Sequence, residues 1–304
     1  MKHILITGAS GLIGSKLTRN LQAKGHQVSV LSRNPNKIKN VKAYYWNVDK
    51  NEIDKNCLFG IDTVIHLAGE NIGESKWTEK RKKEIIDSRT NSIKLLYEAI
   101  EKTNTPISTI ISASAIGYYG NRGDEILDEN SSAGVGFLSD CCIKWETAVD
   151  TGHKFCKRII KIRISLLLAE NGGALPQLKK PIHYYLSSPM GTGKQWVSWI
   201  HMDDLQSLFI AALENEAYNG IYNASSPNPV TNYELTKSLA KVMNRPLLPI
   251  NIPSFLLKVS MGEMSELILD STRVSSQKIK DLGFKFKYVD LRKALFNLIK
   301  EQTK

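Results

Sequence analysis

Three glycines near the start of the chain, Gly8, Gly11 and Gly14, stand at the spacing G-x-x-G-x-x-G. They follow the apolar run 4–6 and precede a segment of helical periodicity. Glycines here allow a sharp turn, close approach of a phosphate to the backbone, and packing of helix on strand. The helix start adds unpaired N–H groups and a partial positive charge. The pattern predicts a site for a dinucleotide's diphosphate, with a glycine-rich turn that holds no ligand as the alternative. The expected contacts are Gly8, Ser10, Gly11, Leu12, Ile13 and Gly14.

Ser32 and Arg33 follow the second expected strand, at the place where NAD enzymes usually carry Asp or Glu for the ribose 2′-OH. No acid is present there. A guanidinium matches a 2′-phosphate in charge and in fork geometry. We therefore expect NADP(H) rather than NAD(H); the alternative is that Arg33 is an ordinary solvated loop arginine.

The glycine turn and the Ser32–Arg33 loop would lie at the same edge of a sheet if strands and helices alternate along the chain. The first half of the chain has that pattern. Apolar runs predict strands over 4–7, 26–31, 41–46, 62–69, 109–114 and 159–164, and helical periodicity predicts helices over 15–21, 77–102 and 137–149. Continuous apolar strands joined by helices predict an α/β fold with a doubly wound parallel sheet of the Rossmann type.

Beyond residue 168 the pattern loosens, and prolines interrupt it. A helix over 203–213 and a strand over 220–224 are expected to return to the large sheet. We therefore expect a Rossmann domain of residues 1–168 with about 200–226. A smaller mixed C-terminal lobe of about 169–199 with 227–304 would cover the substrate at the carboxyl ends of the strands.

The composition is that of an ordinary globular protein: 304 residues, 23% charged and 42% hydrophobic. No apolar stretch approaches the roughly 20 residues that span a bilayer, and the first strand begins too early to leave room for a signal peptide. The four cysteines lack C-x-x-C spacing, which favours reduced thiols in the cytoplasm and no metal site.

The formal net charge of +11 raises nucleic-acid binding as an alternative. The basic residues are scattered, however, and the only dense run is 80–83. No aromatic residues alternate with them as in nucleic-acid modules. A lysine-rich surface that attracts anionic substrates is the favoured interpretation. The expected partners are a small-molecule substrate and a second copy of the chain in a homodimer, with neither nucleic acid nor membrane.

Four longer motifs carry a resemblance that covers nearly the whole chain. They read TGASGLIG at 7–14, LAGE at 67–70, SASAIGYYG at 112–120 and GTGKQWVSWIHMDD at 191–204. With them the chain resembles an atypical extended short-chain dehydrogenase/reductase of the nucleotide-sugar epimerase superfamily. More narrowly, it is similar to the NAD(P)-binding "epimerase family" branch that has its own C-terminal domain.

This resemblance implies further contacts with NADP. Ser32 and Arg33 would face the adenosine phosphate, and Ile164 would approach the nicotinamide. The adenine-ribose side would be lined by His66, Leu67 and Ala68. Glu84 and Arg89, on the long helix, match positions that border the cofactor in relatives, although a pair on the helix surface explains them equally well.

The catalytic pattern departs from the superfamily, which normally carries Tyr-x-x-x-Lys on a helix. There the lysine and the ribose lower the pKa of the tyrosine, so that its phenol exchanges a proton with the substrate. In the helix 137–149, Lys144 fits the lysine position, and it would contact the cofactor as well. The residue four before it is Asp140. An aspartate beside an ammonium is ionised and donates protons poorly.

Three interpretations of the chemistry remain open. In the first, Tyr118 or Tyr119 supplies the phenol from the neighbouring loop, and Ser112 or Ser114 orients the carbonyl. In the second, Cys142 acts as acid or nucleophile, although a buried thiol is the commoner role. In the third, the protein binds NADP(H) without turnover. We favour the first, and the expected catalytic residues are Ser114, Tyr118 and Lys144.

The motif at 191–204 also has a mechanical interpretation. Gly191 and Gly193 permit a tight turn over the cofactor, and His201 is expected to hold the loop rather than to titrate. The sequence as a whole predicts an NADP(H)-dependent oxidoreductase or epimerase of the atypical extended class. It would act on a small polar carbonyl or alcohol compound or on a sugar nucleotide. A non-catalytic NADP(H)-binding sensor or scaffold is the alternative.

Overall fold

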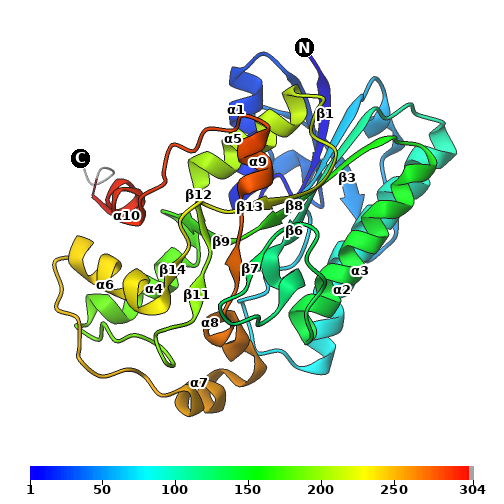
Figure 1. Cartoon of the computed structure of the whole chain (residues 1–304). Coiled ribbons are helices and arrows are strands. Elements are labelled where there is room, and N and C mark those ends of the chain that lie inside the picture. Colours follow the sequence, from blue (N-terminus) through cyan, green and yellow to red (C-terminus); the bar gives the residue numbers. More distant parts are fainter. Residues whose placement is uncertain (301–304) are drawn as a thin grey trace.

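The computed structural model describes residues 1–300, and its centre is an eight-stranded sheet in the order β13-β8-β6-β5-β1-β2-β3-β4 (Figure 1). All neighbours pair in parallel except β3 and β4. This confirms the predicted doubly wound sheet. The strands are β1 (His3–Thr7), β2 (Gln27–Ser32), β3 (Lys42–Asn47), β4 (Glu52–Ile53), β5 (Thr63–His66), β6 (Thr109–Ala115), β8 (Arg158–Ile164) and β13 (Gly220–Ala224).

Helices cover both faces of this sheet. On one side α2 and α3 lie next to each other, and on the other side α1 packs against α5 (Figure 1). Their bounds are α1 (Leu12–Ala23), α2 (Glu79–Thr103), α3 (Phe137–Asp150) and α5 (Met202–Glu214). The prediction that the helix near 203–213 and the strand 220–224 return to the sheet is confirmed, because β13 pairs with β8.

The order of chain connection reverses between β1 and β5. Strand β1 continues to β2 on one side, while the later strands β5, β6 and β8 add on the other side. Ligands of open α/β sheets bind beyond the carboxyl ends of the strands at such a point. The turns after β1, β5 and β6 are therefore the part of the fold where a ligand is expected.

Most of the remaining elements form a smaller mixed lobe, although Ile279 belongs to the core of the large sheet. The lobe has its own apolar core, which includes Trp199, Leu168, Leu239 and Leu295. Three small sheets lie outside the large one. The first has three strands in the order β10-β9-β12, the second pairs β11 with β14, and the third pairs β15 with β7. Their bounds are β7 (Ile126–Leu127), β9 (Leu166–Ala169), β10 (Gly172–Gly173), β11 (Trp196–Val197), β12 (Trp199–His201), β14 (Val230–Thr231) and β15 (Arg273–Val274). The further helices are α4 (Leu175–His183), α6 (Asn232–Val242), α7 (Ser254–Met261), α8 (Glu266–Leu269), α9 (Gln277–Asp281) and α10 (Leu291–Ile299).

Short 3-10 turns connect several of these elements. One of them, η3 (Ile116–Tyr119), follows β6 and carries Tyr118 and Tyr119. The others are η1 (Pro35–Lys37), η2 (Lys55–Leu58), η4 (Thr151–Lys154) and η5 (Gly262–Ser265). No helix in residues 1–300 is long and apolar enough to cross a membrane.

Candidate functional site

The turn between β1 and α1 is shaped so that only glycine fits. Gly8 has φ +68°, and a Cβ there would lie 2.7 Å from the carbonyl carbon of Leu67. A Cβ on Gly14 would lie 2.4 Å from the carbonyl oxygen of Gly8. Gly11 closes the turn, because its N–H donates to the Gly8 carbonyl at 3.0 Å. The first turn of α1 is thereby pressed against the end of the sheet.

The N-terminus of α1 is open to an anion. Gly11 is the N-cap residue and provides no side-chain cap, and the first turn carries no acid. The first N–H groups of the helix therefore have no side-chain acceptor and retain their partial positive charge. Ser10 and Gly11 are exposed, while Leu12 and Ile13 are half-buried at the same end. This is the geometry that binds phosphate groups.

Thr7 fixes the distance between the two strand ends, a role that the sequence did not reveal. Its hydroxyl oxygen accepts the N–H groups of Leu67 and Ala68, both at 3.1 Å. Leu67 and Ala68 are half-buried directly after β5. The structure thus brings these two predicted contacts next to Gly8.

Ser32 and Arg33 lie at the end of β2, on the same edge of the sheet as the glycine turn. The Ser32 hydroxyl accepts the N–H of Asn34 at 3.1 Å, which orders the loop. Arg33 is exposed, and no residue among 1–300 forms a hydrogen bond or ion pair with its guanidinium. Its charge is therefore free for a ligand.

His66 does not line a ligand cleft, and that prediction is wrong. The residue is 0% exposed, and its ring nitrogens contact the hydroxyls of Ser92 (2.9 Å) and Ser112 (3.3 Å). Burial, with a smaller effect of Arg89, lowers the pKa of His66 to about 3. A neutral imidazole therefore joins α2 to β6 inside the protein.

Glu84 and Arg89, the two residues of α2 that were expected to border the cofactor, point to different surroundings. Arg89 donates to the carbonyl oxygens of Ile85 (2.8 Å) and Glu70 (3.0 Å), and its side chain lies against Gly69 in the loop after β5. Glu84 instead pairs with Arg81 at 3.2 Å on the exposed face of the helix. The structure places Arg89 against the loop that follows β5, whereas Glu84 is a surface residue as in the alternative interpretation.

A buried polar network lies below the carboxyl ends of β6, β8 and β13. The Glu146 carboxylate accepts two bonds from Arg163, from Nε at 2.8 Å and from Nη2 at 2.9 Å. Ser114 donates its hydroxyl to the same carboxylate at 2.6 Å. Arg163 also donates to the Tyr119 hydroxyl at 2.9 Å, which in turn donates to Asn223 at 2.8 Å. Every side chain in this network is buried.

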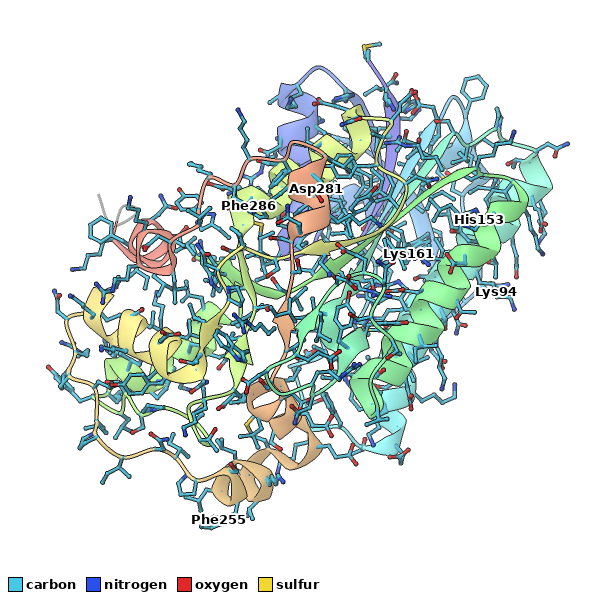
Figure 2. All side chains as sticks on the ribbon, in the orientation of Figure 1. Lys94, His153, Lys161, Phe255, Asp281 and Phe286 are labelled. Carbon is cyan, nitrogen blue, oxygen red and sulfur yellow. The ribbon has the colours of Figure 1, made fainter. Side chains whose placement is uncertain are left out.

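The sequence did contain a signal for this network. Glu146 and Asp150 are one helical turn apart on α3, and Arg163 and Lys161 are two residues apart on β8. The structure pairs each cation of β8 with one acid of α3. Arg163 binds Glu146, and Lys161, which is labelled in Figure 2, donates to Asp150 at 2.7 Å. Charges inside an otherwise apolar strand need such partners.

Tyr118 and Tyr119 have different environments. Tyr119 is 0% exposed, and burial raises its pKa to about 12. Tyr118 is half-buried, its ring lies 3.4 Å from the Arg163 guanidinium, and its carbonyl accepts the Ser139 hydroxyl at 2.9 Å. The Tyr118 hydroxyl has no hydrogen-bond partner within the described chain. Of the two phenols, Tyr118 is the one that a substrate can reach.

Lys144 is not on the same side of α3 as this network, which corrects its predicted position. Two residues along a helix turn the side chain by about 200° from that of Cys142 or Glu146. Lys144 is exposed and lines an outer groove together with Lys83 of α2 and Glu266 of α8. The structure brings Ser114 and Tyr118 to the end of β6, but it does not bring Lys144 to them.

Cys142 occupies the inner face instead, and its environment argues against the second interpretation. Its thiol lies 3.6 Å from the Ala115 carbonyl, to which it donates. Burial raises the pKa of Cys142 to about 12, so the thiol stays protonated near neutral pH. All four cysteines are free and buried.

The motif at 191–204 holds the two parts of the protein together. His201 caps α5 by accepting the Asp203 N–H at 3.0 Å, contacts Asn297 of α10 at 3.2 Å, and stacks on Tyr288 at 3.8 Å. The Asp204 carboxylate accepts the N–H groups of residues 287 and 288. His201 therefore has the structural role that was expected. The tight turn at 191–193 is also present, with φ +62° and +72° at its glycines.

Ile164, at the end of β8, is half-buried and pairs in register with Ala115 and Ala224. It lies at the same carboxyl edge as the glycine turn and the 115–119 segment. Ile164 therefore lies at the carboxyl edge of the sheet, along which an extended ligand would bind. Contact with the nicotinamide stays a prediction.

Comparison with known proteins agrees with this geometry. Residues 4–135 match the model of the NAD dependent epimerase/dehydratase family, and residues 252–298 match a domain of unknown function, DUF1731. The chain is 36% identical over 301 residues to "Epimerase family protein SDR39U1 homolog, chloroplastic" of Arabidopsis thaliana, covering 96% of this chain and 85% of that protein.

Two further relatives match nearly the whole chain. An epimerase family protein of Staphylococcus aureus strain NCTC 8325 / PS 47 is 33% identical over 302 residues, covering 99% of this chain and 100% of the relative. The crystal structure of the human epimerase family protein SDR39U1 with NADPH superimposes with a TM-score of 0.86 at 27% identity. It covers 97% of this chain and 98% of the human chain.

Proposed function

The chain belongs to the NAD-dependent epimerase/dehydratase family, and from that premise we propose that it is an NADP(H)-dependent oxidoreductase or epimerase. Its substrate would be a small polar carbonyl or alcohol compound or a sugar nucleotide. The buried free thiols suit the cytoplasm, where we place the reaction. We also keep the expectation that the protein acts as a homodimer.

One observation carries the cofactor assignment: the uncapped N-terminus of α1, with glycines on which a Cβ would clash with backbone atoms. The amides of this turn would hold the diphosphate, and Arg33 would pair with the 2′-phosphate. The related human structure was determined with NADPH, which supports this choice of nucleotide for our chain.

The chain's own contribution to chemistry would come from Tyr118. NADPH held by the glycine turn and Arg33 would supply a hydride for reduction of the substrate's carbonyl carbon. Tyr118 would donate its phenolic proton to the carbonyl oxygen, which leaves an alcohol and a phenolate. The Arg163 guanidinium lies 3.4 Å from the centre of the Tyr118 ring, and its positive charge would attract the negative charge that forms there.

Ser114 would have a supporting role. Its hydroxyl is committed to Glu146 at 2.6 Å, and only 2% of the residue is exposed. Ser114 would therefore hold Glu146, and through it Arg163, in place below Tyr118. It would orient the carbonyl only if that hydrogen bond were exchanged for one to the substrate.

A second function, NADP(H) binding without turnover, has one specific observation in its favour. The inner face of α3 carries Leu138 and Cys142 where a Tyr-x-x-x-Lys pair would stand, because both approach Gly117. Lys144 is on the outer face. No ammonium therefore supports a phenol from this helix.

Two measurements on the purified protein test these functions. Calorimetry with NADPH and NADH measures cofactor binding, and a panel of aldehydes, ketones and nucleotide sugars with NADPH measures turnover. We expect binding that favours NADPH, and oxidation of NADPH by at least one carbonyl compound. Binding without oxidation by any of them would select the non-catalytic function. No heat with either nucleotide would exclude both functions.

A further inference from the structure

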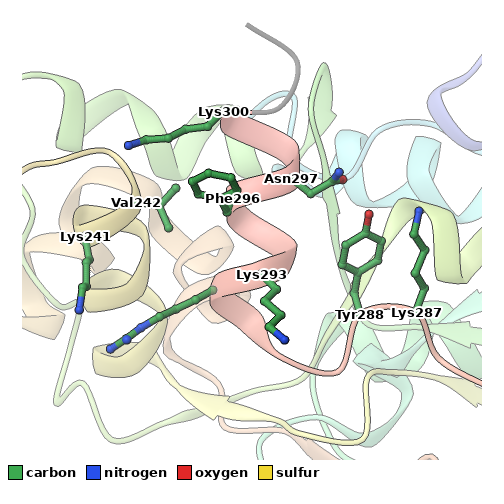
Figure 3. A pocket seen from close by; sticks show the side chains of 9 residues that line it. Lys241, Val242, Lys287, Tyr288, Lys293, Phe296, Asn297 and Lys300 are labelled. Carbon is green, nitrogen blue, oxygen red and sulfur yellow. The ribbon is translucent and has the colours of Figure 1, made fainter. Parts of the chain in front are cut away.

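A groove in the C-terminal lobe lies between the end of α6 and the helix α10, away from the glycine turn (Figure 3). Its cavity volume is about 720 Å³. Pockets for small ligands commonly measure about 300–1,000 Å³. Val242 of α6 and Phe296 of α10 form its apolar part. The groove is thus large enough for one molecule of nucleotide size.

The polar lining of this groove is almost entirely cationic. Figure 3 shows the lysines around it, and no carboxylate lines it within the described residues. The cations are Lys241, Lys287, Arg292, Lys293 and Lys300. Five positive charges around one cavity repel one another, and a multivalent anion would relieve that repulsion.

Most of these charges have no counter-charge within the described part of the chain. Lys241, Arg292, Lys293 and Lys300 form no ion pair with any residue among 1–300. Other cations of the chain are paired, since Arg81 alone lies within 3.5 Å of three glutamates. The groove thus gathers four unpaired cations around one cavity.

The buried Asp204 accepts the backbone N–H groups of Lys287 and Tyr288, and two further acids near the groove are also in use. Asp203 contacts Lys287 at 3.4 Å, but the same carboxylate group is also bonded to Lys16 at 2.6 Å. Asp290 accepts the N–H of Lys293 and thereby caps α10. Neither carboxylate neutralises the groove.

Phe296 adds a flat apolar surface between the cations. It is 47% exposed, and the Lys300 ammonium lies 6.0 Å from the centre of its ring. Tyr288 offers no such surface, because it is buried and stacks on His201. A half-exposed phenyl ring beside unpaired cations suits a planar base that is joined to phosphates.

We propose that this groove binds a nucleoside polyphosphate. The phosphates contact Lys241, Arg292 and Lys293, and the base stacks on Phe296. The volume of the groove is that of a site for one small ligand, whereas a polymer would need a longer basic track. This site is separate from the glycine turn and does not depend on the proposed reaction.

The test is calorimetry with ATP on the full chain, with NADPH in excess to block the glycine turn. We expect one equivalent of ATP to bind, more weakly as salt rises. The double variant Arg292→Gln and Lys293→Gln, at two exposed helix positions, should lose at least tenfold in affinity. The matched control Lys50→Gln and Lys102→Gln removes two exposed charges elsewhere and should leave the affinity within twofold.

The contribution of the base is tested with a third protein and a second probe. Phe296→Leu should weaken ATP several-fold and leave inorganic tripolyphosphate unchanged. Equal binding of ATP and tripolyphosphate by the parent protein would overturn the nucleoside part of the proposal. No ATP binding by the parent protein, or equal ATP affinity in the Arg292→Gln and Lys293→Gln variant, would overturn the site itself.

Discussion

Arg163 of β8 and Glu146 of α3 form a two-bond ion pair in the interior, with distances of 2.8 and 2.9 Å. The residues are only 1% and 5% exposed. A charge in such a place depends on its partner, since an unpaired buried ion costs several kcal/mol. The pair joins the helix to the strand directly beneath Tyr118.

Glu146→Gln should destabilise the protein by about 3–5 kcal/mol, because it leaves the guanidinium without its counter-charge. The double change Glu146→Leu with Arg163→Met should cost less than Glu146→Gln alone, since no charge then remains buried. Urea unfolding measures both. Lys24→Gln, which removes an exposed partner of Glu214, is the control and should cost at most about 1 kcal/mol. Equal losses for Glu146→Gln and the control would contradict the role of the buried pair.

Arg33→Ala should weaken NADPH by about 1.5–3 kcal/mol and leave NADH nearly unchanged, because only NADPH offers the 2′-phosphate. Isothermal calorimetry with both nucleotides gives the two affinities. Lys37→Ala removes a neighbouring exposed charge and serves as the control. If Arg33→Ala weakened both nucleotides to the same extent, the arginine would not be selecting a phosphate.

Gly14→Ala should reduce both stability and NADPH affinity. Its Cβ would lie 2.4 Å from the Gly8 carbonyl oxygen, and backbone atoms must move to accept it. Such overpacking costs about 1–3 kcal/mol. Gly73→Ala is a suitable control, since its nearest neighbour is a side-chain oxygen at 3.7 Å. Thermal unfolding and NADPH calorimetry on both variants decide the matter, and an unchanged Gly14→Ala protein would show that the turn is not tightly packed.

These residues also show how far the sequence alone reaches. The glycine spacing and apolar runs predicted the sheet and the turn, because local sterics and periodicity determine both. His66 was misplaced, since a residue at a strand end faces either a cleft or the interior according to the neighbouring strand and helix. Lys144 was misplaced because the rotation of α3 is set by burial of Cys142 and by the Glu146–Arg163 pair. Such long-range pairing is not fixed by local pattern.

Tyr118→Phe should abolish turnover while NADPH affinity stays within twofold, because the phenol acts only on the substrate. Tyr119→Phe should instead lower the free energy of unfolding by about 1–3 kcal/mol, since it removes a buried bridge between Arg163 and Asn223. The two variants are one another's controls. Steady-state rates with any carbonyl substrate that the panel yields, together with urea midpoints, separate them. Full activity in Tyr118→Phe would remove Tyr118 from the reaction.

His201 should make the protein less stable in mild acid. Burial lowers its pKa from 6.5 to about 4 in the folded state, so below pH 6.5 the unfolded chain takes up a proton that the folded protein does not. The free energy of unfolding then falls by about 1.4 kcal/mol per pH unit from this residue alone. Above pH 6.5 the residue is neutral in both states and the effect vanishes.

His201→Asn isolates this contribution, because asparagine can still cap α5 but does not titrate. The pKa values of His66 and Asp270 also shift on folding. Both residues are present in the two proteins, so their contributions to the pH dependence of the unfolding free energy cancel when the two proteins are compared. Between pH 7 and pH 5 the wild-type protein should lose about 2 kcal/mol more than the variant. Urea unfolding at pH 5, 6 and 7 gives the two curves. Parallel curves would mean that His201 is protonated as readily in the folded protein as in the unfolded chain, and that its contact with α10 does not require a neutral ring.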